Sequence, residues 1–116
     1  MADPINTRCD LMMFGALGDL AQRKLFPALF QLESAGLLHE GSRILAIARN
    51  PADVGKVRKI LFDKLKEHVK QEEFDGDLAE QFLQRVDYQF LDFAHPEGYS
   101  ALNDWRNADS SNLIVY

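Results

Sequence analysis

The sequence predicts an α/β domain with a parallel sheet, and three observations support this fold class. Short apolar runs of strand length alternate with longer segments in which apolar residues recur at helical spacing. The first apolar run lacks polar alternation, as expected where helices cover both faces of a parallel sheet. The chain has 116 residues, 47% of them hydrophobic, which suffices for one ordinary core and is too short for two domains of usual size.

The first strand and the first helix are separated by a short segment that contains two glycines. Asp10 to Phe14 is mostly apolar and predicts a buried strand. From Asp19 to about Ala35 the apolar spacing predicts an amphipathic helix. Pro27 lies inside this helix, where it removes a backbone hydrogen bond and kinks the axis, and Gly36 is the expected C-terminal stop. The expected apolar stripe comprises Leu20, Leu25, Leu29 and Leu32, broadened by Phe26 and Phe30.

A second strand and a second helix are expected next. Arg43 to Ala48 is an apolar run of strand length between polar loops. Asn50 is expected to cap the following helix, with Pro51 in its first turn, where a missing N–H costs nothing. A lysine-rich face on this helix is more typical of a solvated surface than of a phosphate or nucleic-acid site. The apolar face comprises Val54, Val57, Leu61 and Leu65, and the basic face Lys56, Lys59, Lys66 and Lys70.

The last third of the chain continues the alternation. A short third helix leads into a third strand that ends at Asp92 or Phe93. Pro96 opens a fourth helix, and the segment NLIVY at residues 112–116 predicts a fourth strand. The residues expected to face the core are Leu78, Phe82 and Val86 around the third helix, and Tyr99, Leu102 and Trp105 in the fourth.

The resulting order, β-α-β-α-β-α-β, predicts a Rossmann-like parallel sheet with right-handed crossovers. The usual strand order would then be 3-2-1-4, which is the first mononucleotide-binding half plus the strand that begins the second. Leu113 to Tyr116 would form an apolar edge strand, which isolated domains normally avoid. We therefore expect residues 1–9 to be an N-terminal tail and residues 10–116 to form a partial dinucleotide-binding domain. This domain is expected to belong to a longer protein or to pair with a partner along that edge.

Composition excludes several classes of protein. The net charge is -5 and the 13 Lys and Arg residues are scattered, which leaves no electrostatic footprint for nucleic acid. Cys9 is the only cysteine, so we expect no intrachain disulfide, no Cys-based zinc site and a reducing, cytoplasmic setting. A packing role is expected for this residue rather than a nucleophilic one. No apolar run approaches the roughly 20 residues that span a bilayer, and the first nine residues lack the apolar middle segment of a signal peptide.

Gly15 and Gly18 follow the first strand in the pattern G-x-x-G-x-x-A, which differs from the usual G-x-G-x-x-G of dinucleotide sites. Gly15 permits a sharp turn, Gly18 lets backbone approach a pyrophosphate, and Ala21 permits close packing of the helix on the strand. The helix N-terminus then directs N–H groups at the anion. Glycines can also serve turn geometry alone, but the β-α-β context favours nucleotide binding. The absent Gly-Lys-Ser/Thr ending excludes a P-loop. Asp19 is expected to cap the helix rather than act as an acid catalyst.

The end of the second strand bears on the choice of dinucleotide. NAD-specific sites place an acidic residue there to hold the ribose 2′-hydroxyl, whereas this chain has Arg49. The Arg49 guanidinium suits a 2′-phosphate, which favours NADP as the cofactor. From the residue alone, a surface arginine near a helix cap is an equally good interpretation. Asp92 and Phe93 end the third strand at the same carboxyl edge, where adenine could lie.

The segment FGALGDLAQRKLFPALFQL, residues 14–32, resembles the N-terminal signature of the glucose-6-phosphate dehydrogenase family. In that signature a strand leads into G-x-x-G-D-L-A, a basic pair and K-L-x-P-A-L. Further along, RILAIARNP resembles the family's second strand, which ends in Arg, and FLDF its third. Pro27, which helix propensity does not explain, is part of the signature. The matching residues are Gly15, Gly18, Asp19, Leu20, Ala21, Arg23, Lys24, Leu25, Pro27, Ala28 and Leu29.

The resemblance implies an oxidoreductase that oxidises glucose 6-phosphate to 6-phosphogluconolactone with NADP, the entry step of the pentose phosphate pathway. It also implies a homo-oligomer when full length and a reaction without a metal, because hydride passes directly to the nicotinamide. Leu17 departs from the Ser or Thr common at its position, which removes a hydroxyl contact and leaves the backbone N–H. The implied cofactor contacts are Gly15, Ala16, Leu17, Gly18, Asp19, Leu20, Ala21, Gln22, Arg49, Asp92 and Phe93.

Catalysis is not expected from this chain alone. The family's catalytic His, its Asp partner and the lysines that hold the sugar phosphate belong to later segments, and His39, His68 and His95 match none of them. An alternative is a free-standing dinucleotide-binding or regulatory module without activity, which the coding sequence beyond Tyr116 would distinguish. A short-chain-type reductase is disfavoured, because its glycine spacing and its Tyr-x-x-x-Lys are absent.

Overall fold

The computed structural model describes residues 9–38, 41–49, 52–91, 99–107 and 113–115. Four strands form one sheet in the order β3-β2-β1-β4, and each neighbouring pair is parallel. This result confirms the predicted fold class and strand order. The strands are β1 (Asp10–Phe14), β2 (Arg43–Ala48), β3 (Val86–Phe90) and β4 (Leu113–Val115), and the α-helices are α1 (Phe26–Ser34), α2 (Val54–His68), α3 (Gly76–Leu83) and α4 (Tyr99–Asn107).

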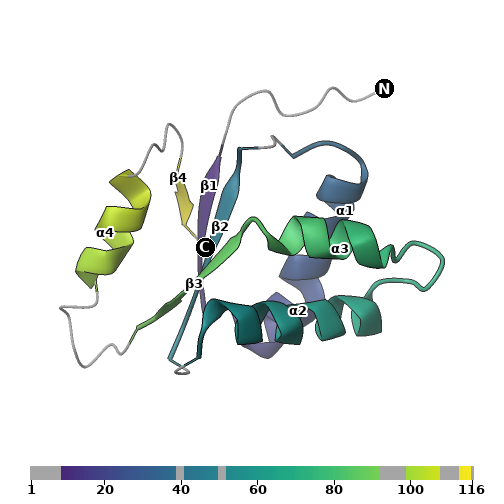
Figure 1. Ribbon diagram of the computed structural model, residues 1–116, viewed down its shortest axis with the longest axis horizontal. Helices are drawn as coiled ribbons and strands as arrows, with labels where there is room; N and C mark the ends of the chain where they lie inside the picture. The colour runs from purple at the N-terminus through teal and green to yellow at the C-terminus, as the bar shows by residue number, and fades with distance from the viewer. Residues whose placement is uncertain (1–8, 39–40, 50–51, 92–98, 108–112, 116) are drawn as a thin grey trace.

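Helices lie on both faces of the sheet, with α1, α2 and α3 on one face and α4 on the other (Figure 1). Neighbouring residues of a strand point to opposite faces, so Met12 and Met13 enter different cores. The large core, between the sheet and α1 to α3, includes Met13, Ile44, Ala46, Phe26, Phe30, Leu61, Leu65, Phe82 and Val86. The small core, between the sheet and α4, comprises Met12, Leu45, Ile47, Leu91 and Leu102, with Phe14 and Trp105 packed against it.

The first helix contains a π-helical turn, η1 (Ala21–Leu25), directly before α1. The Phe26 N–H donates to the Ala21 carbonyl, five residues back. Proline has no N–H, and its ring clashes with the carbonyl four residues earlier in an α-helix, so a wider turn ahead of Pro27 relieves that conflict. The sequence predicts an irregular helix at Pro27, and the structure shows that the irregularity is a π-helical turn.

The π-helical turn also changes which residues of this helix face the core. Phe26 and Phe30 are each 1% exposed, whereas Leu20, expected on the apolar stripe, is 54% exposed. A π-helical turn takes more residues than an α-helical one, so it rotates the residues before it away from the face that follows. Placing Leu20 on the buried stripe was therefore wrong. Gly36 lies beyond the end of α1 with a φ of 70°, as expected of a C-terminal stop.

Two predicted element boundaries also shift. The helix α2 begins at Val54 with Asp53 as its cap, because the Asp53 carboxylate accepts the Lys56 N–H at 2.8 Å. The predicted cap, Asn50, is thus wrong by three residues, and Asn50 and Pro51 lie outside the described residues. Val86, expected to face the core around the third helix, is the first residue of β3. The predicted end of that strand at Asp92 or Phe93 and the helix start at Pro96 also lie outside the described residues.

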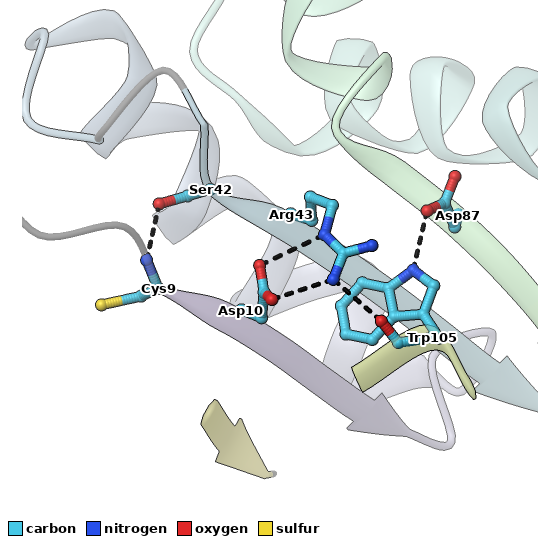
Figure 2. A network of polar contacts seen from close by, with 6 residues as sticks. All are labelled: Cys9, Asp10, Ser42, Arg43, Asp87 and Trp105. Atoms are coloured by element: carbon cyan, nitrogen blue, oxygen red, sulfur yellow. Dashed lines mark hydrogen bonds and ion pairs between the residues drawn. The ribbon is translucent and has the colours of Figure 1, made fainter. Parts of the chain in front are cut away.

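The amino ends of the strands carry a network of charged side chains (Figure 2). Asp10, fully buried at the start of β1, accepts hydrogen bonds from the Arg43 guanidinium at 3.3 and 2.9 Å. Arg43 also donates to the Trp105 carbonyl at 3.0 Å and lies 4.0 Å from the centre of its ring. The indole N–H of Trp105 in turn donates to Asp87 at 2.8 Å. These contacts attach the last turn of α4 to the amino edge of the sheet.

A second buried pair lies at the same edge. Arg85, just before β3, donates to both carboxylate oxygens of Glu33 at 3.3 and 3.0 Å. It also donates to the Ser42 carbonyl at 3.0 Å. Glu33 is 8% exposed although it lies on the helix α1. Burial of these charges is compatible with folding because each is paired and hydrogen-bonded.

Candidate dinucleotide-binding site

The turn between β1 and the first helix is held chiefly by backbone contacts. Gly15 has a φ of 69°, a left-handed conformation that favours glycine. The Gly18 N–H donates to the Gly15 carbonyl at 2.9 Å, and the Ala16 N–H donates to Ile47 of β2 at 3.1 Å. A methyl group on Gly18 would lie 3.1 Å from the Gly15 oxygen, so a larger residue would have to displace that carbonyl by a few tenths of an ångström. The turn conformation predicted for Gly15 is therefore confirmed, while the approach of a pyrophosphate to Gly18 stays a prediction.

The helix that follows the turn presents its N-terminus at the carboxyl edge of the sheet. Helical geometry begins at Asp19, and the first N–H groups of a helix have no acceptor within it. Ala21 is 3% exposed and packs in the large core, as its small size predicts. A pyrophosphate would be stabilised by the unpaired N–H groups and by the positive end of the helix dipole. It could also approach the turn closely, because Gly15 and Gly18 have no Cβ atoms. The residues present therefore fit the anionic part of a dinucleotide.

Leu17 and Gln22 contact each other across the turn. Gln22 donates a hydrogen bond from Nε2 to the Leu17 carbonyl at 3.0 Å, and its backbone N–H donates to the Gly18 carbonyl at 3.1 Å. The Leu17 side chain is partly buried and packs against the large core. Sequence reasoning missed this side-chain contact; the available signal was an amide side chain five residues after the carbonyl, within reach across one helical turn.

Asp19 does not act as predicted. Its carboxylate forms an ion pair with Arg23 at 2.9 Å, four residues along the same helix, and its side chain is 81% exposed. Among the described residues, we find no backbone N–H that donates a hydrogen bond to it. The expectation of an Asp19 cap is therefore wrong, because Asp19 is already inside the helix and faces the next turn. Lys24, the second member of the basic pair, is exposed.

Arg49 lies at the same edge as the glycine turn. It is exposed and directly follows β2, and the hydrogen bond from Ala16 to Ile47 joins the two segments just before it. The third strand reaches this edge too, since the Leu91 N–H donates to the Ala48 carbonyl at 2.9 Å. Asp92 and Phe93, the other expected contacts, lie outside the described residues. The structure thus brings the turn and the position of Arg49 to one edge.

The three histidines are not part of the glycine turn as far as the structure describes them. His68 is the last residue of α2, at the opposite end of that helix from the loop that carries Arg49. His39 and His95 lie outside the described residues. Within the part of the chain that the structure describes, no group of His, Cys, Asp and Glu side chains is placed to hold a metal ion. No helix in that part has the length and apolar character needed to cross a membrane.

Comparison with known proteins gives one consistent result. The family model described as "Glucose-6-phosphate dehydrogenase, NAD binding domain" matches residues 12–116. The chain is 37% identical over 108 residues to glucose-6-phosphate 1-dehydrogenase of Dickeya dadantii, covering 93% of this chain and 22% of the relative. It is 35% identical over 96 residues to the enzyme of Mycolicibacterium smegmatis, covering 83% of this chain and 19% of the relative.

A solved structure is similar in the same way. A glucose-6-phosphate dehydrogenase in complex with its substrate glucose-6-phosphate superposes with a TM-score of 0.74 and 27% identity, and the match covers 100% of this chain and 25% of that one. The chain thus spans about a fifth of the length of the curated relatives it matches, 22% and 19% for the two above. The strand-turn-helix geometry and these matches agree, and the chain belongs to the glucose-6-phosphate dehydrogenase family, in its NAD-binding domain.

Proposed function

We propose that the protein oxidises glucose 6-phosphate to 6-phosphogluconolactone with NADP as hydride acceptor, in the pentose phosphate pathway, and that residues 10–116 form part of its cofactor-binding domain. The observation that carries this proposal is the Gly15 to Gly18 turn, which opens a helix beside Arg49 in a chain of this family. The solved relative is named as a complex with glucose-6-phosphate, which supports the same substrate.

The residues of this chain would hold the cofactor rather than perform the chemistry. When bound, the nicotinamide would supply the hydride acceptor. The N–H groups at the start of the helix would bind the pyrophosphate, while Arg49 would bind the 2′-phosphate through its fork of donors. Asp92 and Phe93 are proposed to lie against the adenine. The pyrophosphate contacts serve NAD and NADP alike, so the preference would depend on Arg49.

Preference for NADP is tested by calorimetric titration of the protein that carries this chain. We expect Arg49→Asp to weaken NADP binding by about 10- to 100-fold, since a hydrogen bond to a charged group contributes about 1.5–3 kcal/mol. NAD binding should change little. Lys66→Asp makes the same charge change on an exposed part of α2 and serves as the matched control. Equal affinity for both cofactors, unchanged by Arg49→Asp, would contradict the role of Arg49.

The activity itself is tested by following formation of reduced nicotinamide with glucose 6-phosphate, and with unphosphorylated glucose as the control substrate. Rapid reduction of NADP with the phosphorylated sugar supports the proposal. Tight dinucleotide binding without reduction would instead support a binding module. The proposal also includes a cytoplasmic location and a homo-oligomeric state of the whole protein, which fractionation and light scattering would check.

A further inference from the structure

We infer that Gln22 is a positioning residue of the glycine turn: its side-chain amide fixes the peptide between Leu17 and Gly18 so that the turn presents donors to a pyrophosphate. This inference rests on the proposed function. The carrying observation is the hydrogen bond from Gln22 Nε2 to the Leu17 carbonyl at 3.0 Å. Gln22 is half-buried, and its amide is directed at the protein backbone.

Both ends of this one peptide group are held. Its carbonyl, which belongs to Leu17, accepts the hydrogen bond from the Gln22 amide. Its N–H, which belongs to Gly18, donates to the Gly15 carbonyl at 2.9 Å. Rotation of the peptide would break both bonds together. Gln22 therefore adds a side-chain restraint to a turn in which the N–H groups of Ala16, Gly18 and Gln22 donate to backbone carbonyls.

The restraint matters because glycine allows the rotation. A peptide flip requires a large change in the φ of the residue that follows, and glycine accepts φ values that other residues do not. Gly18 thus lets the backbone approach a ligand closely but also makes the turn easy to distort. A flipped peptide would direct the Leu17 carbonyl oxygen elsewhere and disturb the N–H groups at the start of the helix. Gln22 keeps the arrangement that favours an anion.

The role is tested by Gln22→Met, which preserves side-chain length and helix propensity but removes the donor. In the protein that carries this chain, we expect about three- to tenfold weaker binding of both NADP and NAD, with their ratio unchanged. Binding of 2′-AMP, which lacks the pyrophosphate, should be unaffected. Gln31→Met makes the same change at an exposed position of α1 and should alter none of these values.

A second variant and the unfolding temperature distinguish a positioning role of Gln22 from a folding defect. Gln22→Glu is isosteric, and its ionised carboxylate can only accept hydrogen bonds, so it should weaken dinucleotide binding more than Gln22→Met. Both variants should unfold at nearly the temperature of the unsubstituted protein.

Three outcomes would overturn the inference. Unchanged NADP binding in both variants would remove the positioning role while leaving the proposed function intact. Equal weakening of 2′-AMP and NADP binding would show a general structural defect instead. Absence of dinucleotide binding in the unsubstituted protein would overturn the proposed function, and the role of Gln22 with it.

Discussion

The two edges of the parallel sheet differ in what holds them. At the amino edge, side chains make the contacts: Asp10, Arg43 and Trp105 form a partly buried network, and Arg85 pairs with Glu33. At the carboxyl edge, the Gly15 to Gly18 turn is held chiefly by backbone hydrogen bonds, with Gln22 as the side chain that joins them. At the amino edge, the polar groups connect segments that lie far apart in the sequence. At the carboxyl edge, helix N–H groups stay available to a ligand.

The two arginines at the ends of strand β2 differ in the same way as the two edges. Arg43 begins the strand with its side chain 23% exposed, paired to the fully buried Asp10. Arg49 follows the same strand and is exposed. One arginine is therefore expected to contribute mainly to stability and the other mainly to binding. Substitutions at the two edges separate these contributions.

The largest effect is expected from Arg43→Ala. Removal of the guanidinium breaks the ion pair with the fully buried Asp10, and loss of one member of a buried pair typically costs about 3–5 kcal/mol of unfolding free energy. Urea denaturation of the protein that carries this chain, followed by circular dichroism, measures this loss. The matched variant Arg49→Ala should cost less than about 0.5 kcal/mol, as is usual for an exposed site. Similar losses for both variants would contradict the contrast between the edges.

A smaller effect is expected from Gly15→Ala. Its φ of 69° disfavours a residue with a side chain, so we expect a loss of about 1–2 kcal/mol. Gly36→Ala is the matched control, because Gly36 has a φ of 70° and, like Gly15, open space around its Cα. Thermal unfolding should show comparable losses for the two variants. Only Gly15→Ala should also weaken NADP binding in titrations. An equal loss of NADP affinity with Gly36→Ala would argue against a special role for the turn.

The smallest effect is expected from Trp105→Phe. The aromatic ring beside Arg43 remains, but the hydrogen bond from the indole to Asp87 is lost. Asp87 is 46% exposed, so water can replace the donor, and we expect a loss of about 0.5–1.5 kcal/mol. Circular dichroism again follows unfolding. Dinucleotide affinity should stay unchanged; a coupled loss of affinity would mean that the two edges are not independent.

Local patterns predicted most of the fold. The uninterrupted apolar run at β1 indicated a strand buried on both faces, and the structure places Met12 and Met13 in different cores. The glycine turn was identified correctly because its conformation depends on a few neighbouring residues. The cap at Asp53 could have been found too, since Asp is a preferred cap residue and Asp53 directly precedes Val54, the first residue of the apolar pattern.

The π-helical turn was harder to foresee. Pro27 excludes a regular α-helical hydrogen bond, but several backbone arrangements satisfy that restriction. The large core selects among them by burying Phe26 and Phe30 and leaving Leu20 exposed. The choice depends on packing against α2 and α3, which lie far along the chain.

The sequence by itself determined the strand-turn-helix unit, the parallel order of the sheet and the family, because these depend on short-range spacing and on a contiguous signature. Only the tertiary structure decided the amino-edge network, whose partners lie 33 and 62 residues apart for Arg43 and 52 apart for the pair of Glu33 and Arg85. Such pairs depend on strand register and helix placement, since a shift by one residue turns a strand side chain to the opposite face. The pairing of a buried charge is therefore a property of the assembled fold.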